Sequence, residues 1–255
     1  MDFNELLDLI AVLRSEKGCP WDREQTTDSL KPFIVEETYE VLEAIDEKDA
    51  GALKEELGDL LFHIIFICRL ASEKGEFDIH DVINKIGSKM IARHPHVFGD
   101  AEYRTTEEVL EHWDVHKKKE GKLRESVIEG IPQCLPSLQR AQKLQERVSS
   151  VGFDWERPED VLLKLDEELE EFKNAVKEKK DAGMEEELGD ILFVLVNIAK
   201  FFSLNAEDSL RKTVNKFITR FRHMEITVAE DGRKLSDMTL AEMDALWDEA
   251  KREKG

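Results

Sequence analysis

The amino-acid sequence predicts an all-α protein made of two tandem homologous helical-bundle domains. Apolar residues recur at a spacing near 3.6 along most of the 255 residues, and alternating runs rich in Val, Ile and Thr are missing. A shift of 131 residues also aligns the chain with itself, which indicates a duplicated domain. The predicted limits are 1–124 for the first domain, 125–136 for a linker and 137–255 for the second domain.

Capping residues set the expected beginnings of the first two helices. Asp2 or Asn4 precedes an apolar-periodic stretch that ends near Gly18, and Asp28 precedes a second stretch that runs to about Glu47. Aspartate and asparagine side chains accept hydrogen bonds from the free N–H groups of a first helical turn, so these residues are expected N-caps.

Three further helices are expected in the first copy on the same criteria. Asp49 begins a stretch that runs to about residue 74, before a glycine, and Asp78 begins one that continues through residue 90. Thr105 or Thr106 begins a fifth stretch, which runs through Trp113. The second copy is expected to repeat this order, starting with a helix after residue 136.

The linker prediction rests on residues 121–138, GKLRESVIEGIPQCLPSL. Two glycines and two prolines interrupt this segment, and it has no sustained helical period. We therefore place the boundary between the two domains near residue 125.

Composition excludes several classes of function. The formal net charge is −20, from 57 acidic and 37 basic side chains, and binding to a nucleic acid polymer is not expected because it requires an excess of Lys and Arg. No apolar run approaches the roughly 20 residues that span a bilayer, so no membrane partner is expected. The acidic N-terminus does not resemble a secretory signal and the three cysteines are widely spaced, which predicts a reducing, cytoplasmic location.

Four acidic residues in each copy form the main candidate site. An E-x-x-E pair on one expected helix is followed by an E-x-x-D pair on the next, and residues three apart share a helix face. Both pairs are symmetric about position 48 in the first copy and 179 in the second, where a turn between the helices is expected. An antiparallel hairpin therefore brings four carboxylates to matching heights: Glu37, Glu40, Glu56 and Asp59 in the first copy, and Glu168, Glu171, Glu187 and Asp190 in the second.

Facing carboxylates repel one another unless they are protonated or bridged by cations, and oxygen ligands suit Mg²⁺ or Mn²⁺. The acidic pairs therefore predict a divalent-metal site in each copy, with Mg²⁺ as the cofactor and Mn²⁺ as a substitute. The alternative is a solvated acidic face. Gly58 and Gly189 lie between the acids in mid-helix, which indicates close approach of either a helix or a ligand.

Two rival metal sites fit the residue spacing less well. A di-iron bundle uses Glu-x-x-His pairs, which neither acidic pair supplies, although His63 lies four residues after Asp59. His112 and His116 are four residues apart but lack the Glu of a zinc metalloprotease helix. The run RHPHVFG at 93–99 is interpreted as a structured turn.

Basic and aromatic residues repeat together with the acids and are candidate substrate contacts. Cations neutralise phosphate oxygens, and an indole stacks on any nucleobase, which predicts broad base tolerance. The alternatives are surface charges for the basic residues and core packing for the tryptophans. The candidates are Lys85, Lys89, Trp113 and Lys117 in the first copy and Lys216, Arg220, Trp247 and Lys251 in the second. Asn197 is a further polar candidate for sugar or phosphate, and Phe66 replaces it in the first copy.

The chain resembles the MazG family of tandem-domain nucleoside triphosphate pyrophosphohydrolases. The resemblance rests on the paired acidic motifs, on KGCPWD at 17–22, on RHPHVFG and on LPSLQRAQKLQERVSSVGFDW at 135–155, and it covers essentially the whole chain. It implies the all-α NTP pyrophosphatase fold, usually a homodimer, which uses Mg²⁺ to cleave NTPs and dNTPs to the monophosphate and pyrophosphate. It also implies that the four second-domain acids are metal ligands and catalytic residues, and that the basic residues and tryptophan named above contact nucleotide.

In some members of that family only the second domain is active, but here the first copy retains every counterpart. The expected reaction is attack of water between the α and β phosphates, with Glu36 or Glu167 as the candidate proton acceptor. Secondary cleavage of pyrophosphate to phosphate is a further candidate activity. The alternatives are a dUTPase-like or dCTPase-like enzyme with one preferred base, and a non-catalytic acidic regulatory protein.

Overall fold

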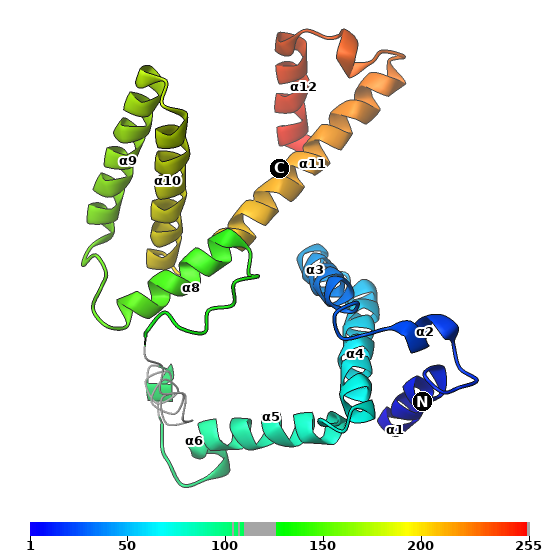
Figure 1. The fold of residues 1–255 in the computed structure, drawn as a ribbon. Coiled ribbons are helices and arrows are strands. Elements are labelled where there is room, and N and C mark those ends of the chain that lie inside the picture. The colour runs from blue at the N-terminus through cyan, green and yellow to red at the C-terminus, as the bar shows by residue number, and fades with distance from the viewer. Residues whose placement is uncertain (104, 107, 110–125, 254–255) are drawn as a thin grey trace. The chain divides into compact units, whose positions relative to one another are not determined.

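The structure is a computed structural model that describes residues 1–103, 105–106, 108–109 and 126–253 (Figure 1). Every regular element within these residues is a helix, which confirms the predicted all-α class. The helices are α1 (Phe3–Leu13), α2 (Pro20–Glu24), α3 (Lys31–Glu47), α4 (Ala50–Glu73), α5 (Ile79–Arg93), α6 (Pro95–Phe98), α8 (Ser137–Ser149), α9 (Pro158–Glu178), α10 (Asp181–Phe201), α11 (Ala206–Glu230), the 3-10 helix η1 (Leu235–Asp237) and α12 (Leu240–Glu253). Among these described helices, none combines the length and apolar character that a membrane crossing requires.

The chain divides into two compact units, Met1–Lys122 and Leu123–Gly255. The predicted boundary near residue 125 lies outside the described residues, so the domain limits stay a prediction. Residues 126–136 contain turns and no helix, and α8 begins at Ser137, directly after the expected linker.

Three predicted N-caps are confirmed by hydrogen bonds to the first turn of their helices. Asp2 accepts one from the N–H of Glu5 at 2.9 Å, and Asp49 accepts one from the N–H of Gly51 at 2.8 Å. Asp78 caps α5 and forms a capping box, as Asp2 does for α1. These caps fix where α1, α4 and α5 begin.

The expected N-cap at Asp28 is wrong. Helix α3 begins at Lys31, after Leu30, and Asp28 instead forms an ion pair with Lys31 at 2.5 Å. Thr26 and Ser29 exchange hydrogen bonds in the preceding turn, and Pro32 in the first helical turn has the backbone angle that a helix start requires. The turn and the proline together move the helix start by a few residues.

Two short helices were not predicted, and the fifth expected helix is only partly described. Helices α2 and α6 have five and four residues and begin at Pro20 and Pro95. Segments this short do not show a helical period in the sequence. Thr105 and Thr106 belong to the described residues, but Trp113, the expected end of the fifth helix, lies outside them.

Each unit is built around an antiparallel hairpin of two long helices. Helices α3 and α4 pack together in the first unit, and α9 and α10 pack together in the second. The turns lie where the sequence symmetry predicts them, because Lys48 and Lys179 have positive φ angles of 57° and 54° and end α3 and α9. A left-handed residue at this position closes a helix and reverses the chain.

The core of the first unit lies where α1 and the 26–30 turn pack on the C-terminal half of α4. Its buried residues are Ile10, Leu30, Ile65, Phe66 and Leu70. In the second unit, α8 packs on α10 in the same way, and Val161, Ile191, Val194 and Val196 are buried.

The helices that follow each hairpin lead away from it. In Figure 1, α11 starts beside α8 and diverges from the α9/α10 hairpin, and α12 folds back along α11. Met224 and Val228 on α11 and Ala250 on α12 are buried between these two helices. Within the first unit, α5 likewise leaves the end of α4 at an angle (Figure 1).

Candidate metal centres

The first acidic cluster lies on the facing sides of α3 and α4. One carboxylate oxygen from each of Glu37, Glu56 and Asp59 lies within 4.8 Å of the others. Glu37 and Glu56 are half-buried and Asp59 is exposed. The hairpin therefore brings together three of the four acids expected in this copy.

Glu40, the fourth acid, is outside that group but lies close enough to interact with it. Burial raises the pKa of Glu40 above its usual range, and the charges of Glu37 and Glu56 raise it further. Burial also raises the pKa of Glu56, together with the charges of Glu55, Asp59 and Glu37. The α3/α4 hairpin thus holds the four carboxylates close together although their negative charges repel one another.

The second acidic cluster lies on α9 and α10, and its group of three includes the counterpart of Glu40 in place of the counterpart of Asp59. Glu168, Glu171 and Glu187 each place one carboxylate oxygen within 4.8 Å of the others. Glu168 is 5% exposed, Glu187 is half-buried and Glu171 is exposed. Burial raises the pKa of Glu187, and the charges of Glu171, Glu168 and Asp190 raise it further, although Asp190 lies outside the group of three.

These donor sets fit a divalent cation. All the grouped donors are carboxylate oxygens, which are the ligands of Mg²⁺ and Mn²⁺ in proteins. A cation bound between them would remove the repulsion that raises the pKa values of Glu40, Glu56 and Glu187. The alternative from the sequence was a solvated acidic face. Such a face does not require carboxylates from two different helices to lie within 4.8 Å of one another.

Each cluster has one neighbouring basic side chain that sequence reasoning did not single out as a partner. Lys164 Nζ lies 2.7 Å from Glu168 Oε1 and 2.9 Å from Glu167 Oε1. The hydrogen bonds that Lys164 donates to Glu168 and Glu167 hold its pKa well above the usual range. In the first unit, His63 Nε2 lies 3.5 Å from Glu37 Oε1.

Gly58 and Gly189 have open space where a side chain would stand. A Cβ added at either position would meet no atom within 4 Å among the residues that the structure describes. Close packing against a helix of the same unit therefore does not explain these glycines. The other sequence interpretation, approach by a ligand, stays a prediction.

The candidate substrate contacts of the second unit lie on the α11/α12 hairpin. The guanidinium carbon of Arg220 lies 5.9 Å from the ring centre of Trp247, and Phe217 lies 4.9 Å from the same ring. Trp247 is half-buried, so it is neither a core residue nor fully exposed to solvent. Lys216 is exposed, and Lys251 forms an ion pair with Asp248 at 2.9 Å.

In the first unit, Lys85 is exposed and Lys89 is half-buried on α5. Trp113 and Lys117 lie outside the described residues, as do His112 and His116 of the rival zinc hypothesis. Among the candidate basic residues that are described, none forms an ion pair with an acid of its own unit's cluster. The structure thus separates the acids from the cations, because α5 and α11 leave the hairpins (Figure 1).

Asn197 is not placed to contact a nucleotide. It is 3% exposed and lies on the side of α10 that also carries the buried Val194, away from open solvent. Its Oδ1 atom has no hydrogen-bond partner in the described part of the chain. The equivalent Phe66 is also buried, so this position packs inside both units and the suggested contact with sugar or phosphate is wrong.

The RHPHVFG segment, expected to be a structured turn, contains the end of α5 and the short helix α6. His94 lies at the N-cap position of α6 without a side-chain capping hydrogen bond, and its Nδ1 lies 2.7 Å from the carbonyl oxygen of Met90. The rings of His94 and His96 are 5.7 Å apart, and that of Tyr103 is 5.0 Å from His96.

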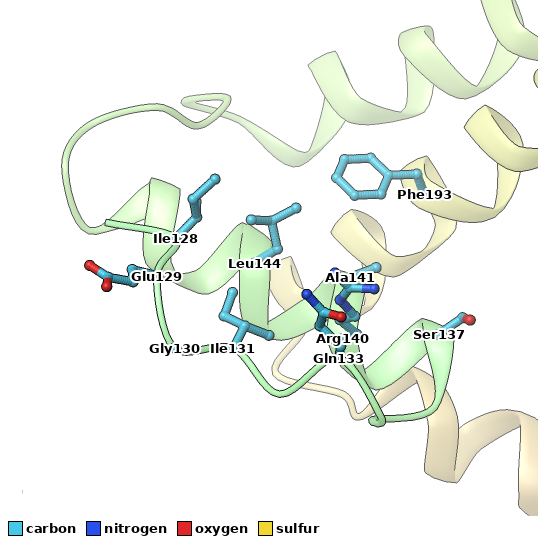
Figure 2. A pocket seen from close by; sticks show the side chains of 10 residues that line it. All are labelled: Ile128, Glu129, Gly130, Ile131, Gln133, Ser137, Arg140, Ala141, Leu144 and Phe193. Atoms are coloured by element: carbon cyan, nitrogen blue, oxygen red, sulfur yellow. The ribbon is translucent and has the colours of Figure 1, made fainter. Parts of the chain in front are cut away.

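A cavity of about 550 Å³ lies in the second unit, but it contains none of the predicted site residues. Figure 2 shows that it is lined by residues 128–131 and 133, by α8 and by Phe193. Arg140 and Glu129 are its charged side chains. Because the acids lie elsewhere on α9 and α10, we assign the candidate chemistry to the acidic clusters and not to this cavity.

Comparison with known families is consistent with this geometry. The MazG nucleotide pyrophosphohydrolase domain matches residues 25–98 and 156–225. These two segments contain all eight candidate acids and the basic residues on α5 and α11, and they end before Trp247 and Lys251.

Two curated relatives match almost the whole chain. The first is a nucleoside triphosphate pyrophosphohydrolase/pyrophosphatase MazG of Thermotoga maritima, 44% identical over 98% of this chain and 95% of its own length. The second is a nucleoside triphosphate pyrophosphohydrolase of Escherichia coli, 42% identical over 98% of this chain and 97% of its own length. A crystal structure of a mazG-related protein from Thermotoga maritima aligns with a TM-score of 0.40 at 30% identity, over 45% of this chain and 98% of that one.

Proposed function

The chain belongs to the MazG nucleotide pyrophosphohydrolase family, and from this membership we infer that it is an enzyme that hydrolyses nucleoside triphosphates. The observation that carries this inference is the pair of carboxylate clusters at equivalent places in the two matched segments. A non-catalytic regulatory role does not account for relatives that are named as hydrolases along the full chain.

We propose that each cluster holds Mg²⁺, which Mn²⁺ replaces. Glu37, Glu40, Glu56 and Asp59 are the proposed ligands in the first unit, and Glu168, Glu171, Glu187 and Asp190 in the second. When bound, the cation supplies a Lewis acid that neutralises phosphate charge and makes water a better nucleophile. The open space beside Gly58 and Gly189 supports access by a triphosphate at the level of the acids.

The proposed reaction forms a bond between a water oxygen and the α phosphorus and breaks the bond from that phosphorus to the α–β bridging oxygen. The products are a nucleoside monophosphate and pyrophosphate, and one proton is released to solvent. Glu36, which is exposed, and Glu167, which is paired with Lys164, stay the candidate acceptors of that proton. In this proposal the residues of the chain bind and orient the triphosphate and accept a proton from the attacking water. No covalent intermediate on the protein is needed.

The proposed nucleotide contacts are the α11/α12 side chains Lys216, Arg220, Trp247 and Lys251, with Lys85, Lys89, Trp113 and Lys117 as their first-domain counterparts. An indole face stacks on any base, so we propose broad base tolerance over NTPs and dNTPs. Narrow selection of one base, as in a dUTPase or dCTPase, would require hydrogen-bond donors and acceptors aimed at base edges.

We also propose that the protein is a homodimer, because large apolar side chains stay exposed on both hairpins and on the helices that follow them. Exposed apolar side chains that gather into a patch mark protein–protein interfaces. A second copy could cover these surfaces and bring its cations to the acids. The exposed residues of the second unit are Leu162, Leu163, Leu188, Leu192, Leu195, Leu210, Val214, Phe217 and Ile218. Analytical ultracentrifugation tests this proposal, and a purely monomeric protein at micromolar concentration would contradict it.

A second activity, cleavage of pyrophosphate to phosphate, is proposed because the Thermotoga maritima relative is also named a pyrophosphatase. A cytoplasmic location is proposed because Cys19, Cys68 and Cys134 are all free thiols.

The experiment that tests the proposed hydrolysis is Mg²⁺-dependent turnover of dNTPs by the wild type and by a variant with both Glu56→Gln and Glu187→Gln. Each substitution removes one grouped carboxylate and retains its shape. We expect turnover in the wild type and its loss in the double variant. Unchanged turnover in the double variant would exclude the acidic clusters as the active sites.

A further inference from the structure

Two sequence differences between the domains occur together beside the acidic clusters. The 131-residue shift aligns Phe33 with Lys164 and His63 with Val194. The first unit therefore lacks the lysine on its first hairpin helix and has a histidine on the second, while the second unit has the opposite arrangement.

In the second unit the lysine holds the most buried ligand candidate. Lys164 Nζ lies 2.7 Å from Glu168 Oε1, and the Glu168 side chain is only 6% exposed. Val194, on the facing helix, is buried and has no polar atom to offer. The partner of Glu168 is thus a permanently charged ammonium group from its own helix.

In the first unit an imidazole takes this role from the opposite helix. His63 is 9% exposed, and its Nε2 lies 3.5 Å from Glu37 Oε1. Its ring is stacked on Phe33 at 5.7 Å and an interplanar angle of 11°, so the residue that replaces the lysine fixes the orientation of the histidine. The Nδ1 atom of His63 has no partner among the described residues.

We propose that His63 and Lys164 are equivalent positioning residues for Glu37 and Glu168, and that the charge of Lys164 makes the second-domain cluster the weaker of two divalent-cation sites. The inference rests on the proposed function, because it treats both clusters as metal sites. The inference assigns different cation affinities to the two domains. The four acids alone would predict equal affinities, because each domain has the same number.

The reason is electrostatic. Both clusters contain four carboxylates, but the second has the ammonium group of Lys164 at 2.7 Å from Glu168, while the corresponding contact of the first is an imidazole at 3.5 Å from Glu37. An ammonium group at this distance repels a divalent cation and occupies a lone pair of Glu168. The second cluster therefore fills mainly when the cation arrives together with the negative charge of a triphosphate, and the first fills without nucleotide.

The test is titration of the full-length protein with Mn²⁺ in the absence of nucleotide, at one fixed, mildly alkaline pH. Electron paramagnetic resonance measures the free Mn²⁺. We expect two classes of site that differ about tenfold or more in affinity. Glu37→Gln should remove the tight class, and Glu171→Gln should remove the weak class.

Variants of the two positioning residues separate charge from structure. Lys164→Met should tighten the weak class by about tenfold, whereas Lys164→Arg should leave it unchanged because it retains the charge. His63→Lys should weaken the tight class by a similar factor. Thermal melting of each variant checks that it is folded.

Equal affinities in the wild type, or an unchanged weak class in folded Lys164→Met, would overturn the inference. If either result occurred while Mn²⁺ binding and dNTP turnover still required the clustered acidic residues, the proposed function would stand and only this inference would fail. A failure of the proposed function would give a different result: neither Glu37→Gln nor Glu171→Gln would alter Mn²⁺ binding.

Discussion

The guanidinium of Arg220 lies over the indole ring of Trp247, 5.9 Å from its centre, so a cation of α11 covers an aromatic face of α12. The two side chains come from helices that pack against each other and away from the acidic hairpin of their own unit. A base that stacks on the indole would lie beside a guanidinium able to bind the phosphates of the same nucleotide.

We expect Trp247→Ala to raise KM for all nucleotides by roughly tenfold or more, because base stacking is worth about 1–3 kcal/mol per base. Trp247→Phe is the matched control and should retain most of the affinity, since it keeps an aromatic face. Steady-state kinetics with purine and pyrimidine dNTPs measure the effect. A KM that rises for one base only would contradict sequence-independent stacking.

The two domains contribute separately to turnover if both clusters are active. Glu187→Gln removes a grouped carboxylate of the second unit, and Glu56→Gln removes its equivalent in the first. Loss of about 3 kcal/mol of transition-state stabilisation would lower the kcat of the affected site by roughly a hundredfold. Comparison of kcat in the two single variants measures the share of each domain. Full activity in both single variants and in the double variant would contradict the assignment.

Without metal, Glu187→Gln should raise the melting temperature at pH 7. The folded-state pKa of Glu187 is raised by burial and by its acidic neighbours, so the folded protein binds more protons than the unfolded chain between the two pKa values. The contribution of Glu187 to stability therefore falls as pH rises through this window, and the neutral amide avoids that loss. Differential scanning calorimetry in EDTA measures the shift.

Saturating Mg²⁺ should reverse this order, because only the wild type keeps the full set of ligands. Below about pH 4 the two proteins should melt alike, because Glu187 is then protonated in both states. A variant that melts below the wild type in EDTA at pH 7 would contradict the account of repulsion between the acids.

Arg14→Met should destabilise the first unit by about 2 kcal/mol, since it leaves the carboxylate of Glu73 without its main partner. Arg14 Nη2 lies 2.6 Å from Glu73 Oε2, and this pair joins α1 to the end of α4. The hydrogen bond from Arg14 lowers the pKa of Glu73, so its stabilising effect is present above about pH 4.5 and is lost as pH falls through the lowered value. Chemical denaturation at pH 7 and pH 3 measures this, and equal losses at both values would contradict it.

Much of the site could be predicted from the sequence because it depends on local rules. The symmetry about residues 48 and 179 locates the turns, and the caps at Asp49 and Asp78 locate the helices beside them. The correspondence of Phe33 with Lys164 and of His63 with Val194 was also visible in the aligned copies. It had no meaning, however, until the structure placed Lys164 and His63 against Glu168 and Glu37.

The rest depends on tertiary contacts that no local pattern encodes. The start of α3 is set by the turn at Thr26 and Ser29, which overrides the capping ability of Asp28. The burial of Asn197 depends on the packing of α8 against α10, because the helical period alone places Asn197 on the same face as the exposed Asp190. The divergence of α11 from the acidic hairpin follows from packing against α8 and α12, which the sequence does not specify.

Product analysis tests the central claim most directly. Purified protein is incubated with Mg²⁺ and each of the eight common NTPs and dNTPs, and the nucleotide products are separated while pyrophosphate and phosphate are measured. The account predicts a monophosphate from most or all of the eight, with one pyrophosphate, or the two phosphates from its further cleavage, for each monophosphate, and no product in EDTA. Release of diphosphate and phosphate, or turnover that is unaffected by EDTA, would contradict it.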